Sequence, residues 1–240
     1  MLFAEWRLVS TGAADCYVNT AIDEATLTLV GEGRVPPTVR LYRWDMPCQT
    51  IGYLQPLRDV DHAIVQRSGY KCVRRLTGGK ACLHGGDISY SLVVSMADTL
   101  IPSRVKSSFQ RISAGVIEGL RLLGVDARYV PPAQILVGGQ VIGTAAQARR
   151  QGVLLHQGTI ALSDSGIGGD VIQPCYTLMP LNSIVGGEVE VESATEALSM
   201  GLKRALGVDL SPSVLFAKEK RLARQLLREK YTRPEWTFSH

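Results

Sequence analysis

Residues 74–91 read RRLTGGKACLHGGDISYS, and this stretch holds the densest group of chemically useful side chains in the 240-residue chain. The adjacent residues Arg74 and Arg75 precede the double glycine Gly78-Gly79, so guanidinium groups lie beside a backbone that can approach a ligand closely. A histidine follows four residues after Lys80, with two more glycines behind it. Backbone amides and fixed cations in this order suit an anionic or carbonyl-bearing ligand. The alternative is a pair of ordinary hairpins with surface charges.

Strand patterns come in runs between separated helix patterns along the rest of the chain. The predicted strands cover 6–10, 39–44, 50–54, 70–75, 80–83, 87–94 and 153–162, and a hairpin over 134–142 turns at Gly138-Gly139. The predicted helices cover 19–30, 60–68, 102–123, 193–206 and 217–230, while the glycine-rich residues 163–187 have no clear pattern. Runs of strands between separated helices predict an α+β fold with a mainly antiparallel central sheet. We expect a domain over 1–192 and a helical extension over 193–240 packed on it, or one domain containing both.

The apolar runs, the first residues and the cysteines of the chain exclude several classes of protein. The chain has no apolar run of about 18 or more residues, so no membrane-spanning helix is expected. An acid and a base interrupt the opening MLFAEWRLVS, which is unlike a signal-peptide core and predicts a cytoplasmic protein. The five cysteines, at 16, 48, 72, 82 and 175, are odd in number and include no C-x-x-C pair. Neither a disulfide framework nor a metal site is therefore expected.

Basic residues gather near the C-terminus although the formal charge of the chain is only +4. They are Lys218, Lys220, Arg221, Arg224, Arg228 and Lys230. Aromatic residues are few and do not interleave with them, so stacking on nucleic-acid bases is not predicted. A basic patch of this kind steers an acidic protein partner, or it is simply a solvated helix face.

The order of residues in the 74–91 stretch resembles the motif RRxxGGxAxxH…YS of the superfamily that includes lipoate–protein ligase A, octanoyltransferases and biotin protein ligase. Further segments resemble that family in the same order: NTAIDEA at 19–25, PPTVRLYRW at 36–44, IGYLQ at 51–55, GTAAQ at 143–147, LHQGT at 155–159, and KY at 230–231 followed by Trp236. The resemblance covers nearly the whole chain. It implies the biotin/lipoate protein ligase catalytic-domain fold, with an acyl chain held under the Arg–Gly–Gly loop and a lysine of a lipoyl domain as acceptor.

Three details favour acyl transfer over ATP-dependent ligation. Lys80 stands where the ligases have a third glycine, and Gly85 stands where they have an aspartate. Cys175 closes an I-x-P-C segment that resembles the one holding the nucleophile in a transferase branch, although Tyr176-Thr177 do not continue that branch's pattern. A thiolate accepts an acyl group from one thioester and passes it to an amine.

The resemblance then implies that an octanoyl or lipoyl group moves from acyl carrier protein to a cysteine thioester and on to lipoyl domains of 2-oxoacid dehydrogenases or to the glycine cleavage H protein. No cofactor is firmly implied, and neither nucleic acid nor membrane is a predicted partner. A lipoate–protein ligase using ATP and Mg²⁺ is the second interpretation, favoured by the KY…W ending. A catalytically impaired acyl-binding relative is the third.

The third interpretation depends on Gln140, which occupies the place of a family lysine and brings no positive charge to a thiolate or an oxyanion. Lys80, on the facing glycine loop, is our candidate for the missing cation. The predicted catalytic residues are therefore Cys175, Gln140 and Lys80. The predicted substrate-binding residues are Arg74, Arg75, Thr77, Gly78, Gly79, His84, Tyr90, Ser91, Gly143, Ala145, His156 and Gly158, with Asp87 in a supporting role.

Overall fold

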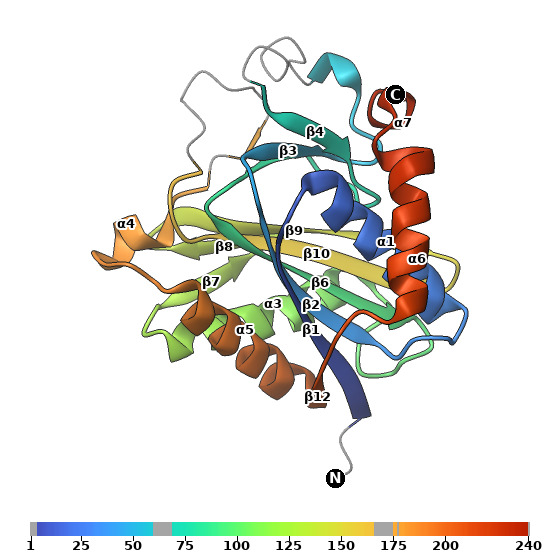
Figure 1. Ribbon diagram of the computed structural model, residues 1–240. Helices are drawn as coiled ribbons and strands as arrows, with labels where there is room; N and C mark the ends of the chain where they lie inside the picture. Colours follow the sequence, from blue (N-terminus) through green and yellow to red (C-terminus); the bar gives the residue numbers. More distant parts are fainter. Residues whose placement is uncertain (1–3, 60–68, 166–174, 177, 240) are drawn as a thin grey trace.

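The computed structural model of the protein describes residues 4–59, 69–165, 175–176 and 178–239 (Figure 1). Its largest element is an eight-stranded sheet in the order β12-β1-β2-β6-β10-β9-β8-β7. The strands are β1 (Ala4–Ala14), β2 (Thr38–Trp44), β6 (Asp87–Ser95), β7 (Ala127–Val130), β8 (Gln134–Val137), β9 (Gln140–Arg150), β10 (Val153–Ala161) and β12 (Val208–Ser213). Neighbours from β2 to β7 are antiparallel, whereas β1 pairs in parallel with both β2 and β12. The predicted α+β fold with a mainly antiparallel sheet is confirmed.

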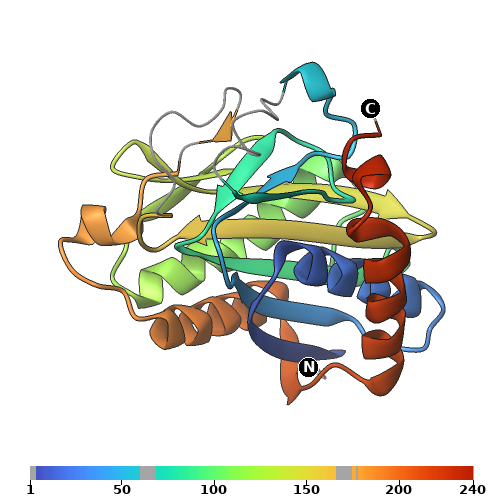
Figure 2. The same cartoon turned by 45° about the horizontal axis from the view of Figure 1, so that its top comes forward.

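A smaller sheet contains the strands around the double glycine. Its order is β11-β5-β3-β4, formed by β3 (Cys48–Ile51), β4 (Lys71–Arg74), β5 (Ala81–His84) and β11 (Cys175–Tyr176). Figures 1 and 2 show these short strands above one end of the main sheet. The turn between β4 and β5 carries the glycine loop, so the fold holds that loop over the large sheet.

Helices cover both faces of the main sheet (Figures 1 and 2). Two of them, α3 (Val105–Leu122) and α5 (Val191–Leu206), pack on one face and enclose the largest apolar core. Their backbones cross closely, because a Cβ on Gly201 would lie 2.2 Å from the backbone nitrogen of Gly119. The other face carries α1 (Cys16–Gly31) and α6 (Ala217–Leu226), whose contact surface includes Ala21, Ala25 and Ala223.

The C-terminal third of the chain contributes to both layers. Strand β12 extends the main sheet beside β1, and α5 buries Leu198 and Leu202 in the largest core. A buried ion pair between Arg7 Nη2 and Glu219 Oε1, 2.8 Å long, joins β1 to α6. The predicted boundary at 192/193 stays a prediction.

Most element boundaries agree with the sequence patterns to within a few residues. The predicted helix over 102–123 is α3, and 217–230 contains α6 followed by a π-helical turn at Leu227–Tyr231. The patterns missed the length of β9, the short α4 (Leu181–Val185) and the C-terminal α7 (Pro234–Thr237). The helix predicted over 60–68 lies outside the described residues. Across the part of the chain that is described, no helix is long and apolar enough to cross a membrane.

Candidate active site

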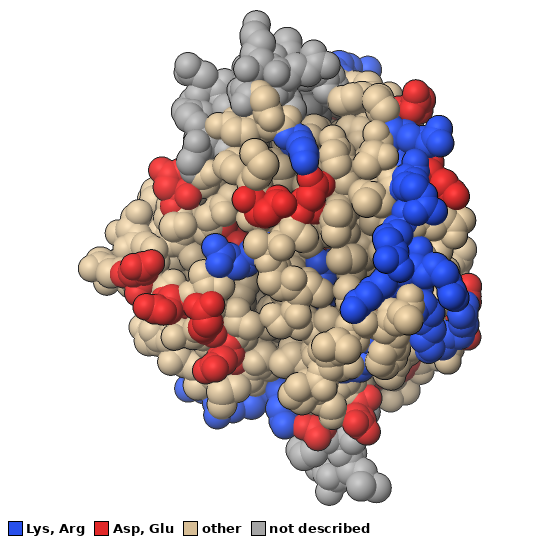
Figure 3. Space-filling view, viewed as in Figure 1, with Lys and Arg blue, Asp and Glu red and all other residues tan. Residues whose placement is uncertain are grey.

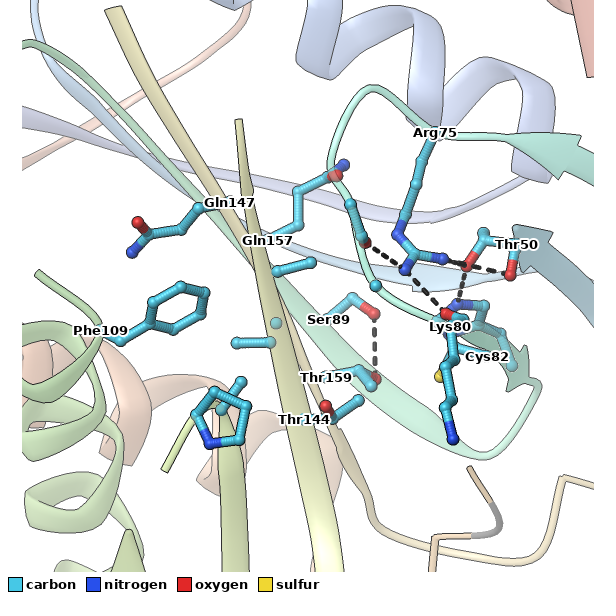
Figure 4. Close-up of a pocket in the computed structure, with 18 of the residues that line it drawn as sticks. Thr50, Arg75, Lys80, Cys82, Ser89, Phe109, Thr144, Gln147, Gln157 and Thr159 are labelled. Carbon is cyan, nitrogen blue, oxygen red and sulfur yellow. Dashed lines mark hydrogen bonds between the residues drawn. The ribbon is translucent and has the colours of Figure 1, made fainter. Parts of the chain in front are cut away.

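A cavity of about 370 Å³ lies between the small sheet and the main sheet (Figure 4). Its volume is in the usual range for small-molecule sites, about 300–1,000 Å³. Seven of the predicted site residues line it: Arg75, Gly78, Gly79, Lys80, His84, Ala145 and Gly158. Apolar lining comes from Val105, Phe109, Pro132, Ala133 and Ala146, while Thr50, Ser89, Gln157 and Thr159 add polar groups. Apolar walls with a few placed polar groups suit a short acyl chain bearing a reactive carbonyl.

Arg75 organises the glycine loop from within the cavity wall. Its Nη2 donates to the carbonyl oxygens of Gly78 at 2.6 Å and of Lys80 at 2.8 Å, and its Nε donates to Thr77 Oγ1 at 3.1 Å. The loop also needs glycine on the facing segment, because a Cβ on Gly52 would lie 1.9 Å from the carbonyl oxygen of Gly79. Through these hydrogen bonds Arg75 holds the loop in its shape.

Arg74 lies apart from the residues that line the cavity. It is fully buried, and its guanidinium donates to backbone carbonyls of the segment after β3 (Gly52, Tyr53 and Gln55) and to Thr237 O. Adjacent residues of a strand point to opposite faces, so the two arginines serve different parts of the molecule. Arg74 ties the loop at 52–55 and the C-terminal helix to the small sheet.

The buried carboxylate of Asp23 is linked to the cavity wall by hydrogen bonds. Asp23 forms a 2.8 Å ion pair with Arg40, and Gln157 donates its Nε2 to Asp23 Oδ2 at 2.6 Å. The other end of that amide, Gln157 Oε1, accepts the hydroxyl of Thr77 at 2.7 Å. Thr77 Oγ1 in turn accepts from Arg75. A chain of hydrogen bonds thus runs from Asp23 on α1 to the glycine loop, and it fixes the orientation of the Gln157 amide in the cavity wall.

A second buried carboxylate holds His84. Asp87 Oδ2 lies 2.9 Å from His84 Nδ1, the other ring nitrogen lies 3.0 Å from Thr50 Oγ1, and the imidazole stacks on Trp44 with ring centroids 4.1 Å apart. Burial opposes a charge on His84, but Cys82 and Asp87 outweigh it and raise the His84 pKa to about 10. Burial likewise opposes the charge of Asp87, yet its bonds to His84, and further ones from Thr159 and the Gly85 amide, lower its pKa to about 2. The pair is ionised at neutral pH.

Five predicted residues stand behind the cavity wall. Thr77 and Ser91 are buried hydrogen-bonding partners of Gln157 and Asp23. Tyr90 stacks beside His156, whose Nδ1 bonds to the Gln147 amide at 2.8 Å. Burial, with the positive charge of Arg149 second, lowers the His156 pKa to about 3, so this histidine is neutral. Gly143 leaves room for Ile160, whose Cδ1 would lie 2.4 Å from a Cβ there.

The three predicted catalytic residues come from neighbouring parts of the fold. The backbone of Cys175 pairs with Ala81 in the small sheet, one residue after Lys80, which is exposed and lines the cavity. Residues 172–174 of the I-x-P-C segment lie outside the described residues. Gln140, the first residue of β9, is exposed and is not part of the cavity lining. Met179 N donates to Val141 O at 2.8 Å, so the chain shortly after Cys175 returns to the residue beside Gln140.

Several residues of the cavity lining were not predicted from the sequence, among them Trp44, Thr50, Cys82 and Gln157. The period of two in a strand would have found Cys82, because it lies two residues before His84 on the same face of β5. Gln157 stands between two predicted residues, His156 and Gly158, and its amide bonds to both Thr77 and Asp23. Thr50 and Trp44 required knowledge of how the two sheets face each other.

Comparisons with known proteins agree with this geometry. Residues 15–174 match the model of the lipoyl protein ligase A/B catalytic domain. The octanoyltransferase LipM of Kyrpidia tusciae is 34% identical, with 97% of this chain and 98% of that protein covered, and that of Geobacillus kaustophilus is 31% identical over the same shares.

Two solved structures are similar across their whole length. The bipartite lipoate protein ligase of Thermoplasma acidophilum has a TM-score of 0.85 and 26% identity, covering 98% of this chain and 96% of its own. A lipoate–protein ligase A bound with ATP has a TM-score of 0.85 and 28% identity over 99% of both chains. With the family's catalytic-domain model and full-length relatives both matched, this chain belongs to the lipoyl protein ligase A/B catalytic-domain family.

Proposed function

We propose that this protein is an octanoyltransferase that moves an octanoyl or lipoyl group from acyl carrier protein to a lysine of a lipoyl domain through a thioester on Cys175. One observation carries the proposal: the strand of Cys175 pairs with the strand that leaves the glycine loop, at a cavity sized for an acyl chain. The relatives named octanoyltransferase, which match over nearly all of this chain, support the same reaction.

The reaction has two acyl-transfer steps. The sulfur of Cys175 attacks the carrier thioester, a new C–S bond forms, and the carrier thiol leaves with a proton. The lysine amine then attacks the enzyme thioester, an amide forms, and the Cys175 thiol is released. Val105 and Phe109 on α3 offer apolar surface for the acyl tail (Figure 4). Lys80, the residue before the neighbouring strand β5, is the candidate cation for the developing oxyanion.

An exposed basic band suits the carrier protein. Lys220, Arg221, Arg224 and Arg228 are exposed along α6 and the turn that follows it, and Figure 3 shows basic side chains gathered over that helix. The opposite side of α6 packs against α1, so these charges lie on the outer face of the helix. A carrier protein with an acidic surface would be steered toward this band.

The band continues toward the cavity through stacked cations. Lys230 Nζ lies 3.8 Å from the ring centroid of Trp236, and the guanidinium of Arg150 lies 4.0 Å from that of Tyr53. Arg150 thus extends the cations of α6 toward β9, while its neighbour Arg149 lines the cavity.

The lipoyl-domain acceptor rests on the relatives. One similar structure is described as a bipartite lipoate protein ligase and its E2 lipoyl domain. We extend that acceptor class to this chain, with a 2-oxoacid dehydrogenase lipoyl domain or the glycine cleavage H protein as the substrate to test.

The test compares two donors. The protein is incubated with octanoyl-acyl carrier protein and an apo lipoyl domain without ATP, and in parallel with lipoate and ATP, and the mass of the domain is followed. A mass gain without ATP is expected, and Cys175→Ser should abolish it. Cys72→Ser is the matched control, since Cys72 is buried but does not line the cavity.

The other outcomes reject the proposal. A gain only with ATP selects ligation, in which case Cys175→Ser should be harmless. No gain in either arm, with a domain that a known enzyme accepts, selects a non-catalytic relative.

Docking is tested separately with the double variant Arg224→Glu and Arg228→Glu. It should raise KM for octanoyl-acyl carrier protein by about tenfold or more, while Lys203→Glu on α5 should not.

A further inference from the structure

The cavity has a cation at the end remote from Lys80. Figure 4 shows Phe109 and Gln147 on one side of the cavity and Lys80 on the other. Arg149 lies at the same end as Gln147, because its Nη1 donates to Gln147 Oε1 at 2.9 Å and its Nη2 donates to Ser108 Oγ on α3 at 2.8 Å. Lys80 and Arg149 both line the cavity, so each of its two ends carries a basic side chain.

Arg149 is partly buried, but its partners carry no charge. Arg40, by contrast, forms a buried ion pair with Asp23, whereas both hydrogen bonds of Arg149 go to neutral oxygens. A guanidinium has five N–H donors, so three of those of Arg149 have no partner in the part of the chain that the structure describes. Burial lowers the pKa of Arg149, and no acidic neighbour among the described residues raises it. An anionic group of a ligand would supply the missing counter-charge.

The N-terminus of α3 adds positive potential at the same end of the cavity. Val105, the first residue of the helix, lines the cavity, and the first turn contains no acidic residue. The flanking residues Arg104 and Lys106 are both basic and exposed. Acidic residues are favourable at the start of a helix, where they interact with its dipole, and basic residues are not. A helix start that is surrounded by cations in this way favours a bound anion.

We propose that the cavity also accepts medium-chain acyl groups that carry a carboxylate at the end remote from the thioester, and that Arg149 binds this carboxylate. This substrate class rests on the proposed function, in which the acyl tail lies along Val105 and Phe109. A plain octanoyl tail would bring a methyl group to the guanidinium, whereas the remote carboxylate would form a charge-assisted hydrogen bond with it. The transfer chemistry is unchanged: the C–S bond of the donor breaks, the amide forms, and the remote carboxylate takes no part.

A solvated arginine at the rim of the cavity is the alternative explanation, since long cationic side chains often keep their charged heads in water. The two explanations predict different ligand preferences. With a solvated arginine, a remote carboxylate would not improve the affinity of the cavity for an acyl group. With a carboxylate-binding arginine, the remote carboxylate improves that affinity, and the improvement depends on Arg149.

Two unreactive amides of equal chain length measure the preference. Octanamide represents the octanoyl group, and suberamic acid carries a carboxylate at the far end of the same chain. Isothermal titration calorimetry at neutral pH gives the Kd of each amide for the full chain. We expect suberamic acid to bind at least about tenfold more tightly than octanamide, the low end of what a hydrogen bond between charged groups contributes.

Substitutions at two adjacent arginines assign the preference to one side chain. Arg149→Met should reduce the ratio of the two affinities by about tenfold, whereas Arg149→Lys keeps the charge, loses the planar fork and should retain part of the preference. Arg150→Met is the matched control. The guanidinium of Arg150 lies 4.0 Å from the ring centroid of Tyr53 and outside the described cavity lining, so the ratio should persist. The circular dichroism spectrum monitors the folding of each variant.

A transfer assay with two donors separates this inference from the proposed function. With suberyl-acyl carrier protein as donor, the apo lipoyl domain should gain the mass of a suberyl group, while octanoyl-acyl carrier protein tests the proposed function in parallel. Equal affinities for the two amides, a preference that survives Arg149→Met, or a failure of suberyl transfer each overturns this inference. With octanoyl transfer intact, these outcomes leave the proposed function standing. No binding of either amide and no transfer from either donor overturns both.

Discussion

Asp23→Ala removes a buried carboxylate whose hydrogen bonds hold side chains of the cavity wall. We expect it to be among the single substitutions that lower the stability of the protein most. Asp23 is 1% exposed and faces Arg40, also 1% exposed, at 2.8 Å. Its oxygens also accept from Ser91 at 2.8 Å, Gln157 at 2.6 Å and Tyr42 at 3.3 Å. The substitution leaves one cation and three donors without their shared acceptor.

The ion pair sets the size of the loss. Removing one partner of a buried ion pair costs about 3–5 kcal/mol, because an uncompensated charge remains inside. For a protein of this size, 1 kcal/mol shifts the melting temperature by about 2–4 °C, so Asp23→Ala should lower Tm by roughly 6–20 °C. Replacing the other partner as well, with Arg40→Met, should recover part of the loss, since a buried apolar side chain no longer lacks a counter-charge.

Thermal unfolding followed by circular dichroism measures both variants. Asp209→Ala is the matched control: Asp209 pairs with Lys203 at the surface, both side chains are 53% exposed, and the expected change is below about 1 kcal/mol. The reasoning fails if Asp23→Ala melts within about 3 °C of the parent protein. It also fails if Arg40→Met adds its full cost to that of Asp23→Ala, because the two residues would then be energetically independent.

Three further substitutions test other parts of the site. Gly52→Ala should destabilise the protein by about 1–3 kcal/mol and abolish acyl transfer, because its Cβ would displace the carbonyl of Gly79; urea unfolding and transfer rates measure the two effects. Arg74→Lys keeps the charge but loses the planar fork that reaches several carbonyls, and should cost about 1.5–3 kcal/mol by urea unfolding, where an unchanged midpoint would contradict us. His84→Asn should cost about 3–5 kcal/mol near pH 6 by breaking the pair with Asp87. The His84 pKa rises from 6.5 to about 10 on folding, so the stabilisation is complete below pH 6.5, and the deficit of the variant should shrink as the pH rises toward 10.

The elements of the fold were largely predictable because their signals are local. The apolar spacing of α3 and the largely apolar composition of β10 are local features, and both elements formed where the sequence placed them. The length of β9 was not predictable in this way. Its second half, AAQARR, lacks a clear apolar alternation and forms a strand because β10 pairs with it along its length.

The residues of the cavity divide in the same way, into those that a local pattern identifies and those that only the tertiary structure brings together. Gly78, Gly79 and His84 were found because they belong to one contiguous motif in the turn and strand around the loop. Thr50 and Gln157 come from strands of different sheets, and only the tertiary arrangement makes them face one cavity. The buried carboxylates are harder still, since an Asp in a helix such as Asp23 is more often exposed than buried.

The adjacent arginines show what strand periodicity adds to a sequence motif. We expected both guanidinium groups beside the ligand, yet neighbouring side chains of an extended segment point in opposite directions. The alternation rule, applied at Arg74 and Arg75, would have assigned one arginine to the cavity and the other to the layer behind it. The same rule applied to β5 selects Cys82 and His84 together. Strand periodicity inside a functional motif therefore separates the residues that face the ligand from those that hold them, and it needs only the order of the amino acids.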